Sequence, residues 1–330
     1  MKMAVFTHLY MDIGFEEMLD IVKSKGVDAV EIGSGGLVGK AHCNPRTLLD
    51  DASAMEKFKT ALSSREMEVV CLSTHGNPVH PQKAIAEAVH RDIIDSIDLA
   101  AELGVKRIVT FSGCPGDSEG AKYPNWPVSP WPDDFQEILK WQWEEVLIPY
   151  WKETGAYAEA KGVQIALELH GGFSVHTPYT LVKLREATSS AIGANLDPSH
   201  LWWQGIDPVA AIRYLGQYDA LYYFHAKDTE INLNNAAVYG LTDMQSYANI
   251  ASRSWQFRTV GFGHDMKEWA DILSTLRIAG YDDVISIEHE DAMMSPNEGL
   301  EKAIANLGPL VMREPAALPQ MFSRTGKERA

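Results

Sequence analysis

One unit recurs along this chain: a segment with helical spacing, then a glycine, then a short run of β-forming residues. The glycines are Gly26, Gly104, Gly162 and Gly280, and the run after Gly104 reads KRIVTF. Glycine just past a helix end is the usual left-handed cap, and the run that follows it is typical of a strand. Repeated helix–strand units predict a parallel sheet, because parallel strands need a helical crossover.

Eight strands can be counted in this way. Their expected ranges are 3–7, 28–32, 68–73, 107–112, 164–169, 191–197, 221–227 and 284–288. Eight such units with nearly continuous apolar strands match a (β/α)8 TIM barrel, which has a typical length of about 250 residues plus insertions. The alternative, a doubly wound sheet, needs a glycine-rich phosphate loop after the first strand, and THLYMDIGF is not one. We therefore predict an α/β TIM barrel as a single domain over 1–312, followed by a tail at 313–330.

Two long segments follow strands at the face where barrels build their active sites. Residues 113–133 are rich in proline and glycine and carry Trp126 and Trp131, and residues 228–259 form a long stretch after the seventh strand. Long loops at this face are more often functional than decorative. Trp126 and Trp131 are therefore candidate substrate-binding residues, and the alternative for these loops is a packing or oligomer contact.

The charge of the chain argues against one class of partner. It has 45 acidic and 29 basic residues and a formal net charge of −16. Nucleic-acid binding needs a basic surface, so no nucleic acid is expected. A small anionic substrate in a locally positive pocket remains compatible with this balance.

Compartment is addressed by three further features. No apolar run approaches the length that spans a membrane, and Asp12 interrupts the first residues before a signal-peptide core could form. The three cysteines contain no C-x-x-C pair, so no disulfide framework is implied. We expect a cytoplasmic protein with no membrane partner.

Ionisable residues end four consecutive strands of the predicted barrel. IALELH contains Glu168, ANLDPSH contains Asp197, YYFHAKD contains His225 and VISIEHED contains Glu288. These strand ends converge on one pole of a barrel, and burying a carboxylate without a partner is unfavourable. Carboxylates and imidazole together suit Mn²⁺, Mg²⁺, Co²⁺ or Zn²⁺. A shared divalent metal is therefore favoured over four unrelated polar ends.

Other side chains near the same pole are candidates for substrate contacts. Pro198 can start a helical turn that brings His200 over the pole, where it could ligate a metal or bind a substrate oxygen. His75 and His170 also follow strand ends, and their alternative role is local hydrogen bonding. Glu31, on the second strand, could orient substrate or pair with a lysine.

The pieces ALELH, NLDPSH, FHAKD and SIEHED, in this order, resemble the xylose-isomerase-like barrel superfamily, the sugar-phosphate isomerase and epimerase group. The resemblance implies that Glu168, Asp197, His225 and Glu288 bind one divalent metal, with Mn²⁺ as the first expectation. It also implies that Glu168 and Glu288 form an acid–base pair and that His200 contacts substrate.

The chain departs from the ketose epimerases of this group at two places. They carry a substrate-binding glutamate where this chain has Ser174, and an arginine shortly after the seventh-strand histidine. Here TEINL follows that histidine, and Arg258 in FRTVGFGH is the candidate substitute. The resemblance also extends to AP endonucleases, in which His75 could mimic a zinc ligand, but the fourth strand ends FSGCPG, without a histidine.

The function expected from the resemblance is a metal-dependent sugar isomerase or epimerase. Its chemistry would be proton removal next to a carbonyl through a metal-stabilised enediolate. The alternative is a lyase that cleaves a 3-keto-glycoside, including a C-glycoside, by β-elimination, because the superfamily includes subunits of such enzymes. A remote alternative is a non-catalytic sugar-binding barrel. We expect a homo-oligomer and leave open a small partner subunit.

Overall fold

The computed structural model describes residues 1–316 and shows a closed barrel of eight parallel strands. The barrel strands are β1 (Lys2–Phe6), β2 (Ala29–Gly33), β3 (Glu68–Ser73), β4 (Arg107–Thr110), β5 (Gln164–Glu168), β6 (Ile192–Leu196), β7 (Leu221–Ala226) and β10 (Val284–Ile287). Each strand pairs with its neighbours along the chain, and β10 closes the ring between β7 and β1. The predicted TIM barrel is therefore confirmed, and the predicted tail, 313–330, lies mostly outside the described residues.

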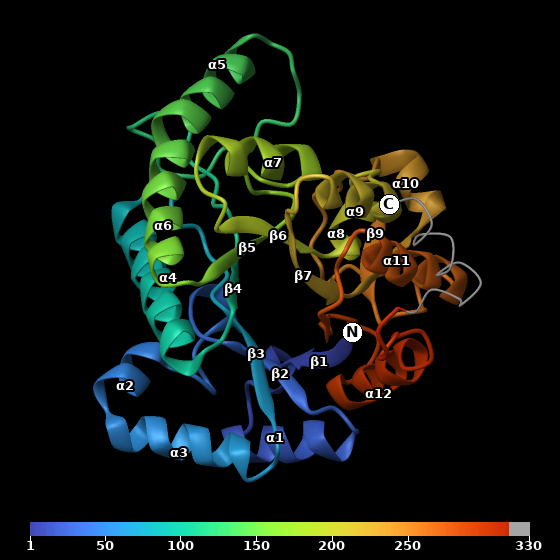
Figure 1. The fold of residues 1–330 in the computed structure, drawn as a ribbon. Coiled ribbons are helices and arrows are strands. Elements are labelled where there is room, and N and C mark those ends of the chain that lie inside the picture. The colour runs from blue at the N-terminus through green and yellow to red at the C-terminus, as the bar shows by residue number, and fades with distance from the viewer. Residues whose placement is uncertain (317–330) are drawn as a thin grey trace, which may run out of the picture.

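Helices surround the strands, as Figure 1 shows. They are α1 (Phe15–Ser24), α2 (Pro45–Asp50), α3 (Ala52–Ser63), α4 (Lys83–Leu103), α5 (Asp134–Trp141), α6 (Ile148–Ala160), α7 (Pro178–Ala187), α8 (Pro198–Trp202), α9 (Pro208–Gly216), α10 (Leu233–Tyr239), α11 (Met266–Ile278) and α12 (Pro296–Leu307), with the short turns η1 (Thr7–Tyr10) and η2 (Gly36–Val38) and the π-helical η3 (Gln142–Leu147). Among residues 1–316, no helix combines the length and the apolarity that a membrane crossing requires.

The glycine stops work as the sequence predicts. Gly104 ends α4 with φ 69°, in the left-handed region, and its amide donates back to the carbonyl of Ala101. A side chain strains the backbone in this region, so glycine is favoured where the helix must turn into the next strand. Gly26, Gly162 and Gly280 share the positive φ. The local cap therefore sets where each of these helix–strand units turns.

The barrel interior changes from apolar to ionic along its axis. Below the carboxyl ends of the strands lies a cluster of mostly small side chains: Ala4, Ala29, Val70, Cys71, Val109, Ala166, Tyr223 and Val284. Arg107, at the start of β4, lies 5.4 Å from the centre of the Tyr223 ring and pairs with Asp283. This packing closes the interior on the amino-terminal side, so the ionisable strand ends face only the opposite pole.

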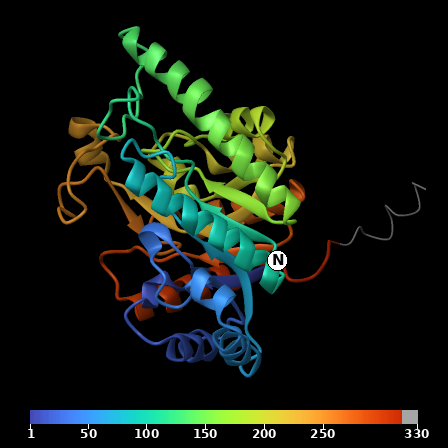
Figure 2. The same ribbon diagram turned by 90° about the vertical axis from the view of Figure 1, so that its left-hand side faces the viewer.

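The long stretch after β7 is not a simple loop. It forms an antiparallel pair, β8 (Asp228–Ile231) and β9 (Trp255–Arg258), with α10 between the two strands. We call residues 228–258 the arm. Figure 2 shows the arm, in orange, on the same side of the molecule as the 113–133 loop. Asp228 anchors its base, because this buried carboxylate accepts from the amide of Gly261 at 2.9 Å and the indole of Trp269 at 3.1 Å.

Candidate active site

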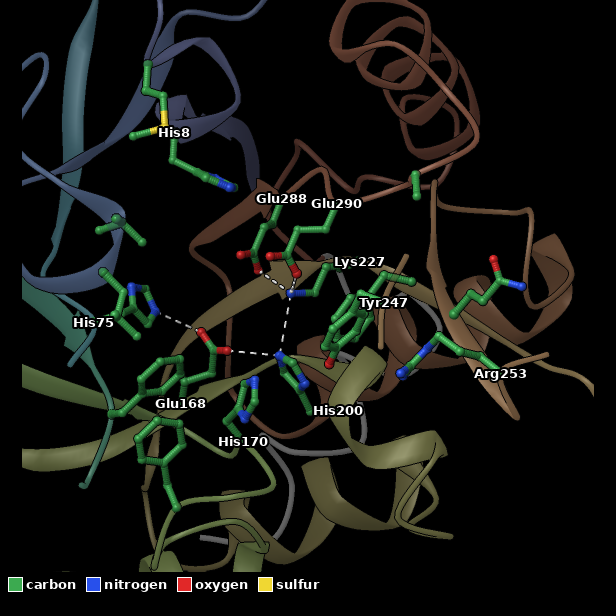
Figure 3. Close-up of a pocket in the computed structure, with 18 of the residues that line it drawn as sticks. His8, His75, Glu168, His170, His200, Lys227, Tyr247, Arg253, Glu288 and Glu290 are labelled. Carbon is green, nitrogen blue, oxygen red and sulfur yellow. Dashed lines mark hydrogen bonds and ion pairs between the residues drawn. The ribbon is translucent and has the colours of Figure 1, made fainter. Parts of the chain in front are cut away.

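A cavity of about 520 Å³ opens at the carboxyl ends of the strands. Five residues that the sequence predicts for the site line it together: His75, Glu168, His170, His200 and Glu288. Figure 3 shows these side chains converging from opposite sides of the pocket. Asp197 and His225 lie beside them, fully buried. The structure therefore brings all the predicted metal and acid–base candidates to one place.

Glu168 is the most highly connected carboxylate of the site. It ends β5, and its two oxygens lie 3.0 Å from His75 Nε2 and 3.0 Å from His200 Nε2. Asn195, on the neighbouring strand β6, donates to it at 3.1 Å. Burial alone would raise the pKa of Glu168, but the histidines around it hold that pKa well below its usual range. Glu168 is therefore kept as a carboxylate.

The two carboxylate oxygens of Asp197 have different roles: one accepts a backbone hydrogen bond, and the other faces the side chains of the site. It caps α8, because its Oδ1 accepts from the amide of Ser199 at 2.8 Å. Pro198 occupies the first helical position, and the turn that it starts places His200 Nε2 3.4 Å from Asp197 Oδ2. Burial raises the pKa of Asp197, and the neighbouring Glu288 and Glu168 raise it further, against Lys227 and His200. The cap thus fixes the direction in which Oδ2 points.

His225 is held from behind by Glu31. His225 Nε2 lies 3.0 Å from both carboxylate oxygens of Glu31, a fully buried residue on β2 that also accepts from Ser286 at 2.7 Å and from Ser73. The other ring nitrogen, Nδ1, faces Glu288 at 3.0 Å and Glu168 at 3.4 Å. Glu31 therefore sets the orientation of the ring, and its partner is a histidine rather than the lysine or substrate that the sequence suggests.

Lys227 places a buried ammonium group among the carboxylates of the site. Its buried Nζ lies 3.1 Å from Asp197, 3.0 Å from Glu288 and 2.7 Å from Glu290. Burial opposes its charge, but these three carboxylates raise the pKa of Lys227 well above its usual value. The ammonium neutralises part of the acidic cluster and links the ends of β6, β7 and β10. Glu288 and Glu290 can therefore follow the buried strand β10, because Lys227 supplies the positive charge that pairs with both carboxylates.

The donor set fits a divalent cation. Glu168, His225 and Glu288 each offer one ligand atom, and these atoms all lie within 4.8 Å of one another. Asp197 Oδ2 and His225 Nδ1 are buried atoms that make no hydrogen bond of regular geometry to a described residue, although the Lys227 ammonium lies 3.1 Å from Asp197 Oδ2 and Glu288 lies 3.0 Å from His225 Nδ1. A histidine oriented by a carboxylate is the usual arrangement behind a metal-binding imidazole. These residues form a candidate metal centre.

Aromatic side chains line the cavity beside the ionic groups. Phe111 and Phe173 stack with their ring centres 4.2 Å apart, and both line the pocket. Tyr247 and Phe257 of the arm stack at 6.0 Å on another part of the wall. Lys227 Nζ lies 4.5 Å from the centre of the Phe257 ring. A ligand here would meet both ionic groups and aromatic faces.

Three predicted substrate-binding residues do not line this pocket. Trp131 is 76% exposed on the 113–133 loop. Trp126 packs edge-on against His176 and lines a different pocket, together with residues of α7. Arg258 forms ion pairs with Glu230 and Asp291 within the arm and its base. Trp126, Trp131 and Arg258 thus lie apart from the candidate ligands in this structure, and their substrate contacts remain a prediction, because loop composition does not determine which way a loop folds. Ser174 also lies away from the pocket, beside Trp126.

The sequence reasoning missed Lys227, Glu290 and Arg253 as pocket residues. A signal existed for the first two, because side chains alternate along an extended chain. Lys227 lies two positions after His225, and Glu290 lies two positions after Glu288, so each follows its neighbour to the same side. Arg253 had no comparable signal, because it lies in the arm, where no periodic pattern places it.

The fold and the ionisable groups at one end of the barrel are those of a TIM barrel with a candidate active site at the carboxyl ends of its strands. Comparison of sequences then identifies the family. The chain belongs to the xylose isomerase-like TIM barrel family, whose sequence model matches residues 19–310. A relative, the uncharacterized protein YfiH of Bacillus subtilis (strain 168), is 38% identical over 312 residues, which cover 93% of this chain and 98% of that protein. The resemblance noted from the strand-end motifs is confirmed.

Solved structures share the fold at lower identity. The probable 3-DHS dehydratase AsbF of Bacillus anthracis has a TM-score of 0.65 at 16% identity, covering 95% of this chain and all (100%) of its own. The IolI protein with a bound zinc atom has a TM-score of 0.64 at 18% identity, covering 96% and 100%. The 3-keto-D-glucoside 4-epimerase YcjR of E. coli has a TM-score of 0.62 at 15% identity, covering 94% and 99%. At these identities the likeness concerns the fold.

Proposed function

We propose that this protein is a divalent-metal-dependent enzyme that isomerises or epimerises a sugar by moving a proton on carbon next to a carbonyl. The observation that carries the proposal is the pair Glu168 and Glu288, on β5 and just after β10, which line one cavity and lie 3.4 Å and 3.0 Å from His225 Nδ1. Two carboxylates that approach a bound sugar from different sides can remove a proton and return one. The sugar epimerase among the structural neighbours supports the same class.

The metal would be held by Glu168, Asp197, His225 and Glu288, with Mn²⁺ the first choice and Mg²⁺, Co²⁺ or Zn²⁺ as alternatives. When bound, such an ion would polarise the carbonyl and stabilise negative charge on its oxygen. The zinc atom in the IolI structure supports metal binding in this fold.

The side chains of this protein have distinct tasks in the proposed reaction. Glu168 lines the cavity as a carboxylate whose oxygens are oriented by His75 and His200, so it is placed to accept the proton. Glu288, next to the Lys227 ammonium at 3.0 Å, is placed to exchange a proton on the other side. His200, which lines the cavity with its Nε2 3.0 Å from Glu168, is placed to contact a substrate oxygen.

One observation favours a second candidate, a lyase that eliminates a β-substituent from a 3-keto-glycoside. The aromatic wall of Phe111, Phe173, Tyr247 and Phe257 offers a surface for an apolar aglycone. Elimination begins with loss of the same carbon-bound proton, so the same glutamates would serve. A partner subunit could be needed for this reaction, and a sugar-binding barrel without turnover is the third candidate.

Product analysis separates these candidates. The metal-loaded protein is incubated in heavy water with free ketoses and, separately, with 3-keto-glycosides, and the products are followed by NMR. We expect a new sugar isomer that carries deuterium on carbon. Glu168→Gln should slow this reaction by about a hundredfold or more, the usual contribution of a general base. Glu68→Gln makes the same change at an exposed carboxylate at the start of β3, and as the matched control it should leave the rate unchanged.

Other outcomes would redirect the assignment. Released aglycone or an unsaturated keto-sugar would establish the lyase and overturn the isomerase. Sugar binding with no deuterium incorporation from any substrate would leave only the binding role. An unchanged rate in Glu168→Gln would remove this glutamate as the base and make His200 the next candidate.

A further inference from the structure

The pocket contains an arginine whose charge has no acidic partner. Arg253 is 2% exposed and lines the cavity. Among residues 1–316, no carboxylate oxygen lies within 4.0 Å of its guanidinium nitrogens, whereas Arg258, five positions further on, pairs with two carboxylates. Burying a charge without a counterion is unfavourable. The arm therefore holds a buried cation with no carboxylate in direct contact among residues 1–316.

The guanidinium is fixed in place by neutral groups. Nε donates to the carbonyl of Trp255 at 3.1 Å, and Nη1 donates to the carbonyl of Gln245. Its Cζ lies 4.1 Å from the centre of the Tyr247 ring and 4.6 Å from that of Trp255. Aromatic faces and carbonyls stabilise the cation and orient its plane. Nη2 is left with no acceptor among the described residues, so it can serve a ligand.

Nearby acidic groups are already engaged. Asp243 is close enough for Arg253 to contribute to lowering its pKa, but its two oxygens accept from the amides of Gln245 at 2.9 Å and Ser254 at 2.8 Å. Glu290 pairs with Lys227 at 2.7 Å. Lys227 and Arg253 are the lysine and arginine of the pocket lining. Lys227 contacts three carboxylates directly, whereas Arg253 contacts no carboxylate within 4.0 Å among the described residues, and Asp243 acts on it only at longer range.

Figure 3 places Arg253 at one end of the pocket and His75 and Glu168 at the other, with Lys227, His200 and Tyr247 between them. A ligand spanning the cavity would therefore present one end to the proposed reacting groups and the other to Arg253. We propose that the substrate is an anionic sugar derivative, a carboxylate or phosphate ester of a sugar, whose oxyanion binds Arg253. This rests on the proposed function and specifies its substrate class.

The test measures binding, and so does not depend on turnover. Affinities of the metal-loaded protein for D-glucuronate, D-glucose 6-phosphate and neutral D-glucose are compared by calorimetry at constant ionic strength. We expect at least one anionic sugar to bind about tenfold to a hundredfold more tightly than glucose, as charged hydrogen bonds allow. The two anionic probes distinguish a carboxylate from a phosphate.

Matched variants identify the residue responsible. Arg253→Gln should abolish the preference for the anionic sugar, and Arg253→Lys, which keeps the charge but loses the fixed fork of donors, should retain only part of it. Arg258→Gln removes the same charge from the same arm outside the pocket, and should leave the preference intact. If Arg253→Gln does not fold, the comparison of Arg253→Lys with Arg258→Gln decides.

Equal affinity of the wild-type protein for glucose and both anionic sugars would overturn the inference, as would equal losses in Arg253→Gln and Arg258→Gln. The proposed reaction is judged separately by the deuterium experiment. Turnover of neutral ketoses that is indifferent to Arg253→Gln would leave the reaction standing without this substrate class. Arg253-dependent binding of an anionic sugar without any proton exchange would support the ligand class and contradict the proposed reaction.

Discussion

Glu31 shows how one buried residue can control a site that it does not line. Its carboxylate fixes His225 through Nε2 at 3.0 Å, and two serines, Ser73 and Ser286, complete its hydrogen bonds. The opposing charge of Glu31 and Glu288 raises the pKa of His225 well above its usual value, although burial acts the other way. Glu31 is thus a positioning residue for the candidate metal centre.

At the residue scale, we predict that Glu31→Gln weakens metal binding by about tenfold to a hundredfold, the usual effect of losing a group that orients a metal-binding histidine. The amide keeps the size of the side chain but has one accepting oxygen instead of a carboxylate. Metal affinity is measured by competition with a chromophoric chelator, with circular dichroism to verify folding. Glu68→Gln, which removes an exposed carboxylate at the start of β3, is the control. Equal affinities in the two variants would contradict this role.

The arm is the element that distinguishes this pocket from a bare barrel. It contributes Tyr247, Ile250, Arg253 and Phe257 to the lining, whereas the barrel strands and their ends supply the candidate ligands. Its two strands pair with each other and not with the barrel sheet. The candidate metal centre and this part of the pocket wall are therefore built by separate elements.

At the element scale, we predict that the distal part of the arm can be removed without loss of the barrel. Asn232 donates to the carbonyl of Ser254 at 2.9 Å, so these two residues can be joined by an Asn-Gly turn in place of 233–253. We expect native circular dichroism and metal binding, but sugar affinity lower by about tenfold or more because charged and aromatic contacts are lost. Calorimetry with the anionic sugars measures this. Loss of the barrel signal would show that the arm is part of the folding core.

The whole molecule concentrates acidic groups at one pole of the barrel. Glu168, Asp197, Glu288 and Glu290 gather there in a chain whose net charge is −16. Lys227 balances part of this charge, and a divalent cation would balance more. Binding at this pole should therefore stabilise the entire fold, because ligands that bind only the native state shift the unfolding equilibrium.

At the scale of the molecule, we predict one divalent ion per chain after EDTA treatment and reconstitution, as expected for a single four-ligand site. The thermal midpoint should rise with metal concentration, in line with about 2.7 kcal/mol of added stability at a hundred times the Kd. Elemental analysis and thermal scans with Mn²⁺, Mg²⁺, Co²⁺ and Zn²⁺ measure both effects. The double variant Asp197→Ala, His225→Ala should lose the ion and the shift, and retention of both would sink the ligand assignment.

The sequence by itself determined the eight barrel strands, the helix ends that precede several of them, and the candidate ligand set. Apolar runs set the strands, and glycines such as Gly104 set the helix ends, because both signals are local properties of the backbone. Glu168 and Glu288 could be placed at one pole because parallel strands of a barrel bring their carboxyl ends together. None of these inferences requires the partner of a side chain to be known.

Only the tertiary structure decided which side chains meet. Glu31 and His225 are 194 residues apart, and their pairing depends on how the strands close the barrel. Arg253 reaches the pocket, and Trp131 does not, because the path of each insertion is set by packing against the rest of the molecule rather than by its composition. Charge partners are chosen among groups far apart in the chain, so a pattern in the sequence could place Lys227 near the site but could not show that it binds three carboxylates there.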